Sequence, residues 1–383
     1  MADEMSTPPL RVWCAPMVLG SELAFRMLTR RHGISLAYSP MIKAHRIVAG
    51  VEEEHNVLAD TSPEDRPLAI QFCGRDPSIL AQAVKIAKQL QGGNIDAFDL
   101  NLGCPQRCAE HGGWGSFLAD EPQLAADCVR AMVAAASPTP VWCKIRIRET
   151  VAKTVNFALE LQAAGCALLA VHCRPRPTGR DQCGHGAIPE YDHLQAVVQA
   201  LQIPVVANGG IETIEIAERV VKETGCHAVM AATGLLRNPR AFTNTTTSSE
   251  PVDVALEYMS LVEQFPPPSV LFVSKHLRWI FREMIQSTYD AAMAAAREHG
   301  TAPTDWRVHV WKFLAQPFLT EAWQFTEVVK YIAAKTNDEE SKLSLKDIRL
   351  GRRVAEIFDA TEEIEKDVNC LSLFGNAEGA DSE

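Results

Sequence analysis

The sequence predicts an α/β protein: a (β/α)8 TIM barrel followed by a smaller all-helical domain. Eight short apolar segments alternate with helical patterns between residues 12 and 231, and this alternation favours a closed barrel of parallel strands over an open sheet. The strand patterns stop after residue 244, and the chain beyond it has helical periodicity instead. No G-x-G-x-x-G pattern follows the first strand, which argues against a dinucleotide-binding Rossmann domain.

The barrel elements follow from short apolar runs and from helical spacing of apolar residues. The predicted strands are residues 12–15, 36–38, 68–72, 97–100, 141–145, 168–172, 205–207 and 228–231. The predicted helices between them are residues 22–31, 77–91, 122–136, 151–164, 191–201 and 214–224. Pro77 and Pro122 each follow an acidic residue, as prolines in the first turn of a helix often do.

A cluster of serine and threonine at residues 245–249 predicts a linker. Beyond it, the segments 252–264, 270–297, 306–313 and 320–335 are predicted to be helical. The expected domains are therefore a catalytic barrel at 1–244, a helical domain at 250–353 and an acidic, flexible tail at 354–383. The tail carries nine acidic residues and one lysine, which is −8 of the formal charge of −11, so the rest of the chain is nearly neutral.

The composition excludes several classes of protein. At 47% hydrophobic residues over 383 positions, the chain can bury a large core. No apolar run approaches the roughly 20 residues of a membrane span, and the acidic start differs from a secretion signal, so we expect no membrane partner. The eleven cysteines lack paired spacing and are expected to be reduced. Cys104 and Cys108 have no second close pair of Cys or His, so we expect no metal.

The residues at and just after the carboxyl ends of the predicted strands are unusually polar, and in a barrel these ends carry the function. In strand order they are Ala15-Pro16-Met17, Gln71, Asn101 with Cys104, Lys144 with Arg146 and Arg148, His172 with Arg174 and Arg176, Asn208-Gly209-Gly210 and Ala232-Thr233-Gly234. Glycine turns after the last two strands suit a phosphate held by backbone N–H groups. The rim therefore predicts a flat, phosphorylated cofactor such as FMN, with Lys144 stabilising negative charge on the reduced ring.

Each of these residues has a structural alternative. Lys144 could pair with a carboxylate inside the barrel, and His172 could be a hydrogen-bonded core histidine. Gln71 could fill the barrel, and Asn208 could serve only a turn. We prefer the functional interpretation because all of them fall on one rim.

Six motifs carry a resemblance to a known family. They are Ala15-Pro16-Met17, Gln71-Phe72-Cys73-Gly74, Asp99-Leu100-Asn101-Leu102-Gly103-Cys104-Pro105-Gln106, Cys143-Lys144-Ile145-Arg146, Val171-His172-Cys173-Arg174 and Ala207-Asn208-Gly209-Gly210-Ile211. With them the chain resembles the tRNA-dihydrouridine synthases over residues 11–240. Gln106, the segment 113–118 and Lys275-His276-Leu277 are most similar to the branch that acts on D-loop uridines at tRNA positions 16 and 17.

The resemblance implies a reaction and a set of site residues. Hydride would pass from reduced FMN to uracil C6, with NADPH as the reductant, and Cys104 would protonate C5 as a thiol that is not strongly acidified. Asn101 would help to hold the uracil. The implied FMN contacts are Pro16, Met17, Val18, Gln71, Lys144, His172, Asn208, Gly209, Gly210, Ala232 and Thr233.

Binding of tRNA requires cations around a uridine that has left its stack. Arg146, Arg174 and Arg176 follow two neighbouring strands. In the helical domain, Lys275, Arg278 and Arg282 are predicted to share one face of a helix beside Trp279, although a solvated face over a core helix would show the same pattern.

Two other functions remain open. The nearest is a flavin-dependent dehydrogenase of a free pyrimidine, which would not need the basic helical domain. The other is an RNA-binding protein that keeps a flavin only for structure. A flavin that NADPH reduces and that tRNA alone reoxidises would separate these alternatives. We expect a monomer in the cytoplasm, with the nucleus as an alternative location.

Overall fold

The computed structural model of the chain describes residues 10–93, 95–177, 187–243, 250–299, 306–314 and 321–336. The predicted acidic tail and the predicted linker at 245–249 lie outside these ranges. The domain boundaries at 244, 250 and 353 therefore stay predictions.

Eight parallel strands form a closed barrel, as the sequence predicts. They are β1 (Val12–Cys14), β2 (Leu36–Tyr38), β4 (Leu68–Cys73), β5 (Ala97–Leu102), β6 (Val141–Ile147), β7 (Leu169–Pro175), β8 (Val205–Asn208) and β9 (Ala228–Ala231). Neighbours pair in the order β2-β1-β9-β8-β7-β6-β5-β4, and β2 also pairs with β4, which closes the ring. The two-residue β3 (Ile42–Lys43) adds to the edge of β4.

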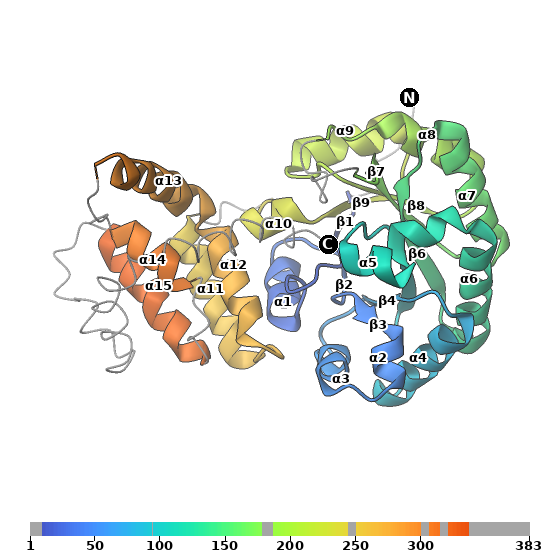
Figure 1. Cartoon of the computed structure of the whole chain (residues 1–383), viewed down its shortest axis with the longest axis horizontal. Coiled ribbons are helices and arrows are strands. Elements are labelled where there is room, and N and C mark those ends of the chain that lie inside the picture. Colours follow the sequence, from blue (N-terminus) through green and yellow to red (C-terminus); the bar gives the residue numbers. More distant parts are fainter. Residues whose placement is uncertain are drawn as a thin grey trace, which may run out of the picture.

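Helices surround the barrel on its outer side (Figure 1). The long ones are α1 (Leu23–Arg31), α4 (Pro77–Leu90), α6 (Pro122–Ala136), α7 (Val151–Ala163), α8 (Tyr191–Ala200) and α9 (Ile214–Thr224), all of which the sequence predicts. Asp76 caps α4 by accepting hydrogen bonds from the N–H groups of Ser78 and Ile79, and Pro77 occupies the first turn. Each helix turns its apolar face onto the strands, so barrel and helices share one core.

Several short elements escape prediction because they lack a long periodic pattern. They are α2 (Ala44–Val48), α3 (Glu52–Ala59), α5 (Arg107–Gly112), the 3-10 helix η1 (Gly115–Asp120) and α10 (Thr233–Arg237). Three of them matter for the rim, because α5 and η1 follow the Cys104 loop and α10 follows β9.

Five helices follow the barrel: α11 (Pro251–Gln264), α12 (Val270–Ile280), α13 (Arg282–His299), α14 (Trp306–Leu314) and α15 (Ala322–Thr336). They lie together at one side of the barrel in Figure 1, and we call them the helical region. Among the described residues, no helix is both long and apolar enough to cross a membrane.

The segment 270–297 is helical as predicted, but it consists of two helices, α12 and α13. The chain leaves helical geometry at Phe281, whose ψ is 2°, and α13 begins at the next residue. The Phe281 side chain is fully buried, so the bend lies where an aromatic ring enters the core. Apolar periodicity continues through such a bend and does not reveal it. Lys275 and Arg278 therefore belong to α12, whereas Arg282 is the first residue of α13.

Helix α1 joins the helical region to the barrel (Figure 1). Glu22, just before α1, has one carboxylate oxygen 2.9 Å from His276 Nε2, and Tyr258 donates a hydrogen bond of 2.8 Å to the other. All three side chains are fully buried. Burial favours a higher pKa for Glu22, but the charge interaction and hydrogen bonds with His276 outweigh it and lower the pKa. The contact between barrel and helical region is therefore specific and polar at its centre.

Candidate active site

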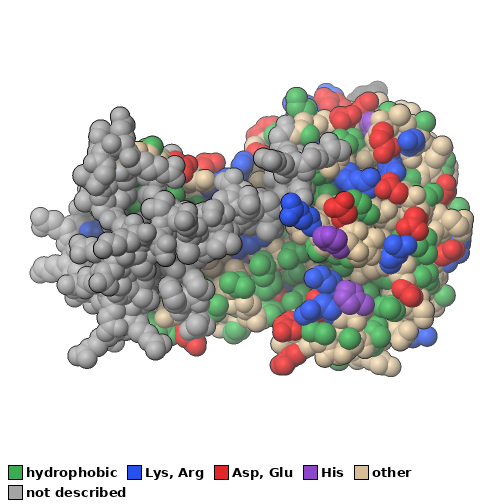
Figure 2. Space-filling model, viewed as in Figure 1, with side chains coloured by type: hydrophobic (Ala, Val, Ile, Leu, Met, Phe, Trp, Pro, Cys, Tyr) green, Lys and Arg blue, Asp and Glu red, His purple; other side chains and the backbone are tan. Residues whose placement is uncertain are grey.

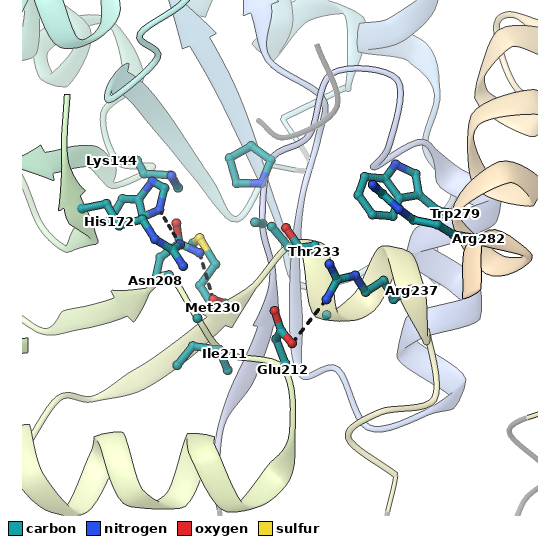
Figure 3. A pocket seen from close by; sticks show the side chains of 17 residues that line it. Lys144, His172, Asn208, Ile211, Glu212, Met230, Thr233, Arg237, Trp279 and Arg282 are labelled. Atoms are coloured by element: carbon teal, nitrogen blue, oxygen red, sulfur yellow. Dashed lines mark hydrogen bonds and ion pairs between the residues drawn. The ribbon is translucent and has the colours of Figure 1, made fainter. Parts of the chain in front are cut away.

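One pocket of about 260 Å³ lies at the carboxyl ends of the strands, between the barrel rim and the helical region (Figure 3). Most of its lining comes from the strands and the segments that follow them, namely Ala15, Pro16, Lys144, His172, Arg174, Asn208, Gly209, Gly210, Ile211, Glu212, Met230, Ala232, Thr233, Gly234 and Arg237. Trp279 and Arg282 from the helical region complete it. The pocket is where a parallel barrel places its functional residues.

Strand register sets which side chains meet at the rim. In the ladder between β5 and β6, Asn101 pairs with Lys144. In the ladder between β7 and β8, His172 pairs with Asn208. Within each pair the two residues are neighbours across the ladder, and the ladder between β6 and β7 places His172 opposite Arg146, two residues after Lys144.

Two glycine turns form one wall of the pocket. Gly209 and Gly210 have φ of +106° and +73°, a region that favours glycine. A Cβ atom on Gly209 would lie 2.9 Å from the His172 ring, and one on Gly210 would lie 2.8 Å from Pro189. A Cβ on Gly234 would lie 2.8 Å from the backbone of Glu212. A side chain at any of these three positions would therefore collide with neighbouring parts of the chain.

Polar side chains fix the rest of this wall. Asn208 donates a hydrogen bond of 2.9 Å to the Met230 carbonyl, which ties β8 to β9. Tyr191 donates one of 2.7 Å to the Gly209 carbonyl, and burial raises the pKa of Tyr191 to about 12, so its hydroxyl stays a donor. Arg174 donates to the Ala187 carbonyl, and its Nη1 lies 3.4 Å from His172 Nε2.

A buried chain of hydrogen bonds leads from β4 and β5 to the Cys104 loop. Asp99 Oδ2 accepts a 2.8 Å hydrogen bond from Gln71, and Gln71 in turn accepts one of 3.0 Å from Asn101. Asn101 Oδ1 accepts from the backbone N–H groups of Gly103 and Cys104, at 3.1 and 2.9 Å. Each amide is therefore held in one orientation, and Asn101 fixes the loop that carries Cys104.

Asp99 is the fully buried acid at the start of this chain. Burial raises its pKa to about 7, although the hydrogen bond from Gln71 and the charge of Lys144 act in the opposite direction. Its Oδ1 atom is buried and has no hydrogen-bond partner among the described residues. Asp99 was not among the site residues expected from the sequence, because nothing in the pattern distinguishes a functional acid inside a strand motif from a structural one.

The Cys104 loop is tightly enclosed. Cys104 is 1% exposed and packs with Cys73, Ala109 and Trp114. Ser116 donates two hydrogen bonds of 3.0 Å to the Cys104 carbonyl, one from its backbone and one from its side chain. Arg146 is 3% exposed and donates to the Gly103 carbonyl at 2.8 Å. Cys104 lies three residues after Asn101 and so beside the Lys144 end of the pocket, but it does not line the pocket.

The pocket brings together most of the expected FMN contacts. Eight of the eleven line it: Pro16, Lys144, His172, Asn208, Gly209, Gly210, Ala232 and Thr233. Met17 and Val18 belong to the turn after β1, where the Val18 carbonyl accepts a 2.8 Å hydrogen bond from Lys275. Gln71 is fully buried in the chain of hydrogen bonds described above.

The basic residues expected to contact RNA have different surroundings. Arg176 donates to Asp120 at 2.8 Å and lies 4.6 Å over the Phe117 ring. Arg278 stacks over Trp311 at 5.0 Å, whereas Arg282 stacks over Trp279 at 4.8 Å and lines the pocket with Arg174. Of Lys275, Arg278 and Arg282, which are predicted to share one face of a helix, only Arg282 lines the pocket.

Sequence reasoning missed Glu212 and Arg237, which form an ion pair of 3.5 Å at the pocket. Both follow glycine-bearing turns, and this position is the signal that could have identified them. Away from the pocket, Glu190, Asp192 and His193 place potential metal ligands within 4.8 Å of one another. Two of these side chains are exposed, and His193 Nδ1 is 2.9 Å from Thr154 Oγ1, so we assign no metal to them.

Comparisons with known proteins agree with the rim motifs. The sequence model of the dihydrouridine synthase family (Dus) matches residues 13–339. A mouse protein named as a tRNA-dihydrouridine(16/17) synthase-like protein is 40% identical over 276 residues, covering 71% of this chain and 55% of the relative. A human tRNA-dihydrouridine(20a/20b) synthase-like protein is 33% identical over 274 residues, covering 71% of this chain and 82% of the relative.

The chain thus spans little more than half the length of its mouse relative. Among solved structures, a 2-naphthoyl-CoA reductase has a TM-score of 0.47 at 12% identity, covering 60% of this chain and 49% of the reductase. That level of likeness carries no argument about this chain.

Proposed function

The chain belongs to the dihydrouridine synthase family, and from this premise we propose that it reduces uridine to 5,6-dihydrouridine in tRNA, at D-loop positions 16 and 17. The observation that carries the proposal is the pocket at the barrel mouth, where Lys144, His172 and Asn208 meet two glycine turns. The mouse relative named for positions 16/17 supports this choice of uridines over the 20a/20b sites.

The residues of the pocket fit FMN. The Gly209-Gly210 and Gly234 turns line the pocket without side chains, so a phosphate could bind to their backbone N–H groups. Lys144 is 4% exposed and suits negative charge on a flat ring. When bound, FMN reduced by NADPH supplies the hydride for uracil C6. His172 and Asn208 would orient the ring, because their positions are fixed by the paired strands.

Cys104 would supply the proton that C5 requires. An unperturbed thiol has a pKa of about 8.5 and is mostly protonated at neutral pH, so it can act as a general acid. Asn101 would hold both the uracil and the Cys104 loop, since its Oδ1 already accepts the Cys104 N–H. Because the thiol is buried among Trp114 and its neighbours, the loop has to shift for the uracil to reach it.

The tRNA would bind across the rim and the helical region. Acidic and basic side chains are interspersed over the face of the barrel that Figure 2 shows, so RNA affinity on this face would come from local clusters of cations. Arg174, Arg176, Lys275 and Arg278 are the proposed contacts. The buried Arg146 would act indirectly by holding Gly103. We also propose that the protein is a monomer and that it acts in the cytoplasm or the nucleus.

The experiment follows flavin and product in the same samples. The purified chain should bind FMN, NADPH should reduce it, and tRNA should then reoxidise it with formation of dihydrouridine. Cys104→Ala should keep FMN binding and reduction by NADPH but lose product, by about a hundredfold or more, because only the general acid is removed.

Cys108→Ala is the matched control, because this exposed thiol is four residues away and should not affect turnover. Normal product formation by Cys104→Ala would contradict the assigned proton donor. Reoxidation by free uracil or orotate instead of tRNA would favour a free-pyrimidine enzyme.

A further inference from the structure

The barrel alone does not complete the pocket. Trp279, in the last turn of α12, and Arg282, the first residue of α13, line the same cavity as Gly209, Gly210 and Thr233. Figure 3 shows Trp279 and Arg282 extending from the helical region toward Thr233 and Arg237, on the side away from Lys144. The packing of α10 against α12 brings the two walls together. Residues on both sides of the break at Phe281, Trp279 before it and Arg282 after it, therefore line the pocket.

The lining residues carry an excess of positive charge. Lys144, Arg174, Arg237 and Arg282 are basic, and Glu212 is the one acidic residue among the lining positions that the structure describes. Glu212 pairs with Arg237 at 3.5 Å, so this carboxylate is directed to α10. An anionic ligand is what such a cavity is suited to bind.

The position of Arg282 is constrained on one side. Its guanidinium carbon lies 4.8 Å over the Trp279 ring, within the range of a cation–π contact. The ring itself is 7% exposed, and its Nε1 has no hydrogen-bond partner among the described residues. A stacked guanidinium keeps its N–H groups in one plane, which suits two-point binding of phosphate oxygens.

We propose that Arg282 pairs with the 5′-phosphate of FMN, so that the helical region contributes directly to the flavin site. This inference rests on the proposed function. The phosphate would lie at the Gly209-Gly210 and Gly234 turns, and Arg282 would contact it from the opposite wall. Arg282 then serves the cofactor and not the tRNA, which revises the role expected from the sequence. The affinity for FMN would then depend on how the helical region docks on the barrel.

The test compares FMN with riboflavin, which lacks the phosphate. Dissociation constants for both flavins are measured by fluorescence quenching on the full chain stripped of flavin, for the unaltered protein, Arg282→Ala and Arg282→Lys. Arg282→Ala should weaken FMN binding by about tenfold or more, the usual effect of losing a charged hydrogen bond, and leave riboflavin binding unchanged. Arg282→Lys should recover part of the loss.

Arg307→Ala is the matched control. Arg307 stacks over Trp306 at 5.6 Å in the same helical region, but it does not line the pocket. Its removal should leave the affinity for both flavins unchanged.

Three outcomes would overturn the proposal. Equal losses for FMN and riboflavin in Arg282→Ala would indicate a purely structural role. Unchanged FMN affinity with weaker tRNA binding would return Arg282 to the RNA surface. If the unaltered protein bound neither flavin, the proposed function itself would fail, which is a different result from an Arg282 variant that binds FMN normally.

Discussion

At the scale of single residues, Asp99 shows how burial changes the chemistry of a side chain. It lies wholly inside the barrel, where a carboxylate is costly unless it is paired and hydrogen-bonded. Among the residues that the structure describes, only Oδ2 has a hydrogen-bond partner, the Gln71 amide. A neutral carboxyl group at this position still accepts the Gln71 hydrogen bond, and so keeps Gln71, Asn101 and the Cys104 loop in place.

Asp99 therefore predicts a dependence of stability on pH. Its pKa is about 7 in the folded chain and near the ordinary value of about 3.9 when unfolded. The folded state thus holds a proton that the unfolded state has lost, and its stability falls as pH rises from about 4 to about 7, with a slope of at most about 1.4 kcal/mol per pH unit.

Asp99→Asn should remove that slope, because Asn accepts the same Gln71 hydrogen bond and does not titrate. Urea unfolding at pH 5 and pH 8 would measure the difference between the two proteins. Asp60, whose pKa burial raises to about 6, is present in both proteins and cancels from the comparison. If the free energy of unfolding changed with pH in the same way in both proteins, the raised pKa of Asp99 would be contradicted.

At the scale of elements, helix α1 holds the β1 end of the rim in place. Arg26 is fully buried and binds Asp65 through Nε at 2.8 Å and Nη2 at 2.7 Å. The same guanidinium donates to the carbonyls of Ser21 and Asp60. Burial favours a higher pKa for Asp65, but Arg26 and Arg30 outweigh it and lower the pKa, so Asp65 stays ionised.

Replacing Arg26 by Met should destabilise the fold by about 3–5 kcal/mol, because it leaves the Asp65 charge buried without its main partner. Denaturant unfolding of the purified variant would measure the loss. Arg31→Ala is the control from the same helix. This side chain is 48% exposed and lies 3.7 Å from Glu257, so its loss should cost less than about 1 kcal/mol. A small effect of Arg26→Met would mean that Arg26 contributes little to α1.

The helices and strands also show how much of the structure could be predicted from the sequence. The eight barrel strands and the long helices follow from apolar periodicity, and the carboxyl ends of the strands identify most of the pocket. The break at Phe281 could not be predicted, because it depends on how one ring packs into a core that brings distant segments together. For the same reason, the sequence placed Arg282 beside Arg278 and missed that Arg282 faces Thr233 across the pocket.

At the scale of the whole molecule, the barrel and the helical region share both a buried contact and a pocket. Glu22 binds Tyr258 and His276, while Phe25 stacks on the His276 ring at 4.0 Å. Lys275 reaches the carbonyl of Val18 in the turn after β1. These contacts set the position of α12, and α12 leads to Arg282. Docking of the helical region and the affinity for a phosphorylated flavin should therefore be coupled.

A double-mutant cycle tests that coupling. Glu22→Ala leaves the buried His276 and Tyr258 groups without their carboxylate, so α12 should loosen and FMN should bind about tenfold more weakly even though Glu22 does not line the pocket. If Glu22 acts through Arg282, adding Arg282→Ala should cause little further loss, because contacting and coupled residues are not additive. FMN titrations of the four proteins would measure the coupling. Glu22→Gln, which still accepts the Tyr258 hydrogen bond, should recover part of the affinity for FMN. Fully additive losses of FMN affinity in the double mutant would show that Glu22 and Arg282 act independently.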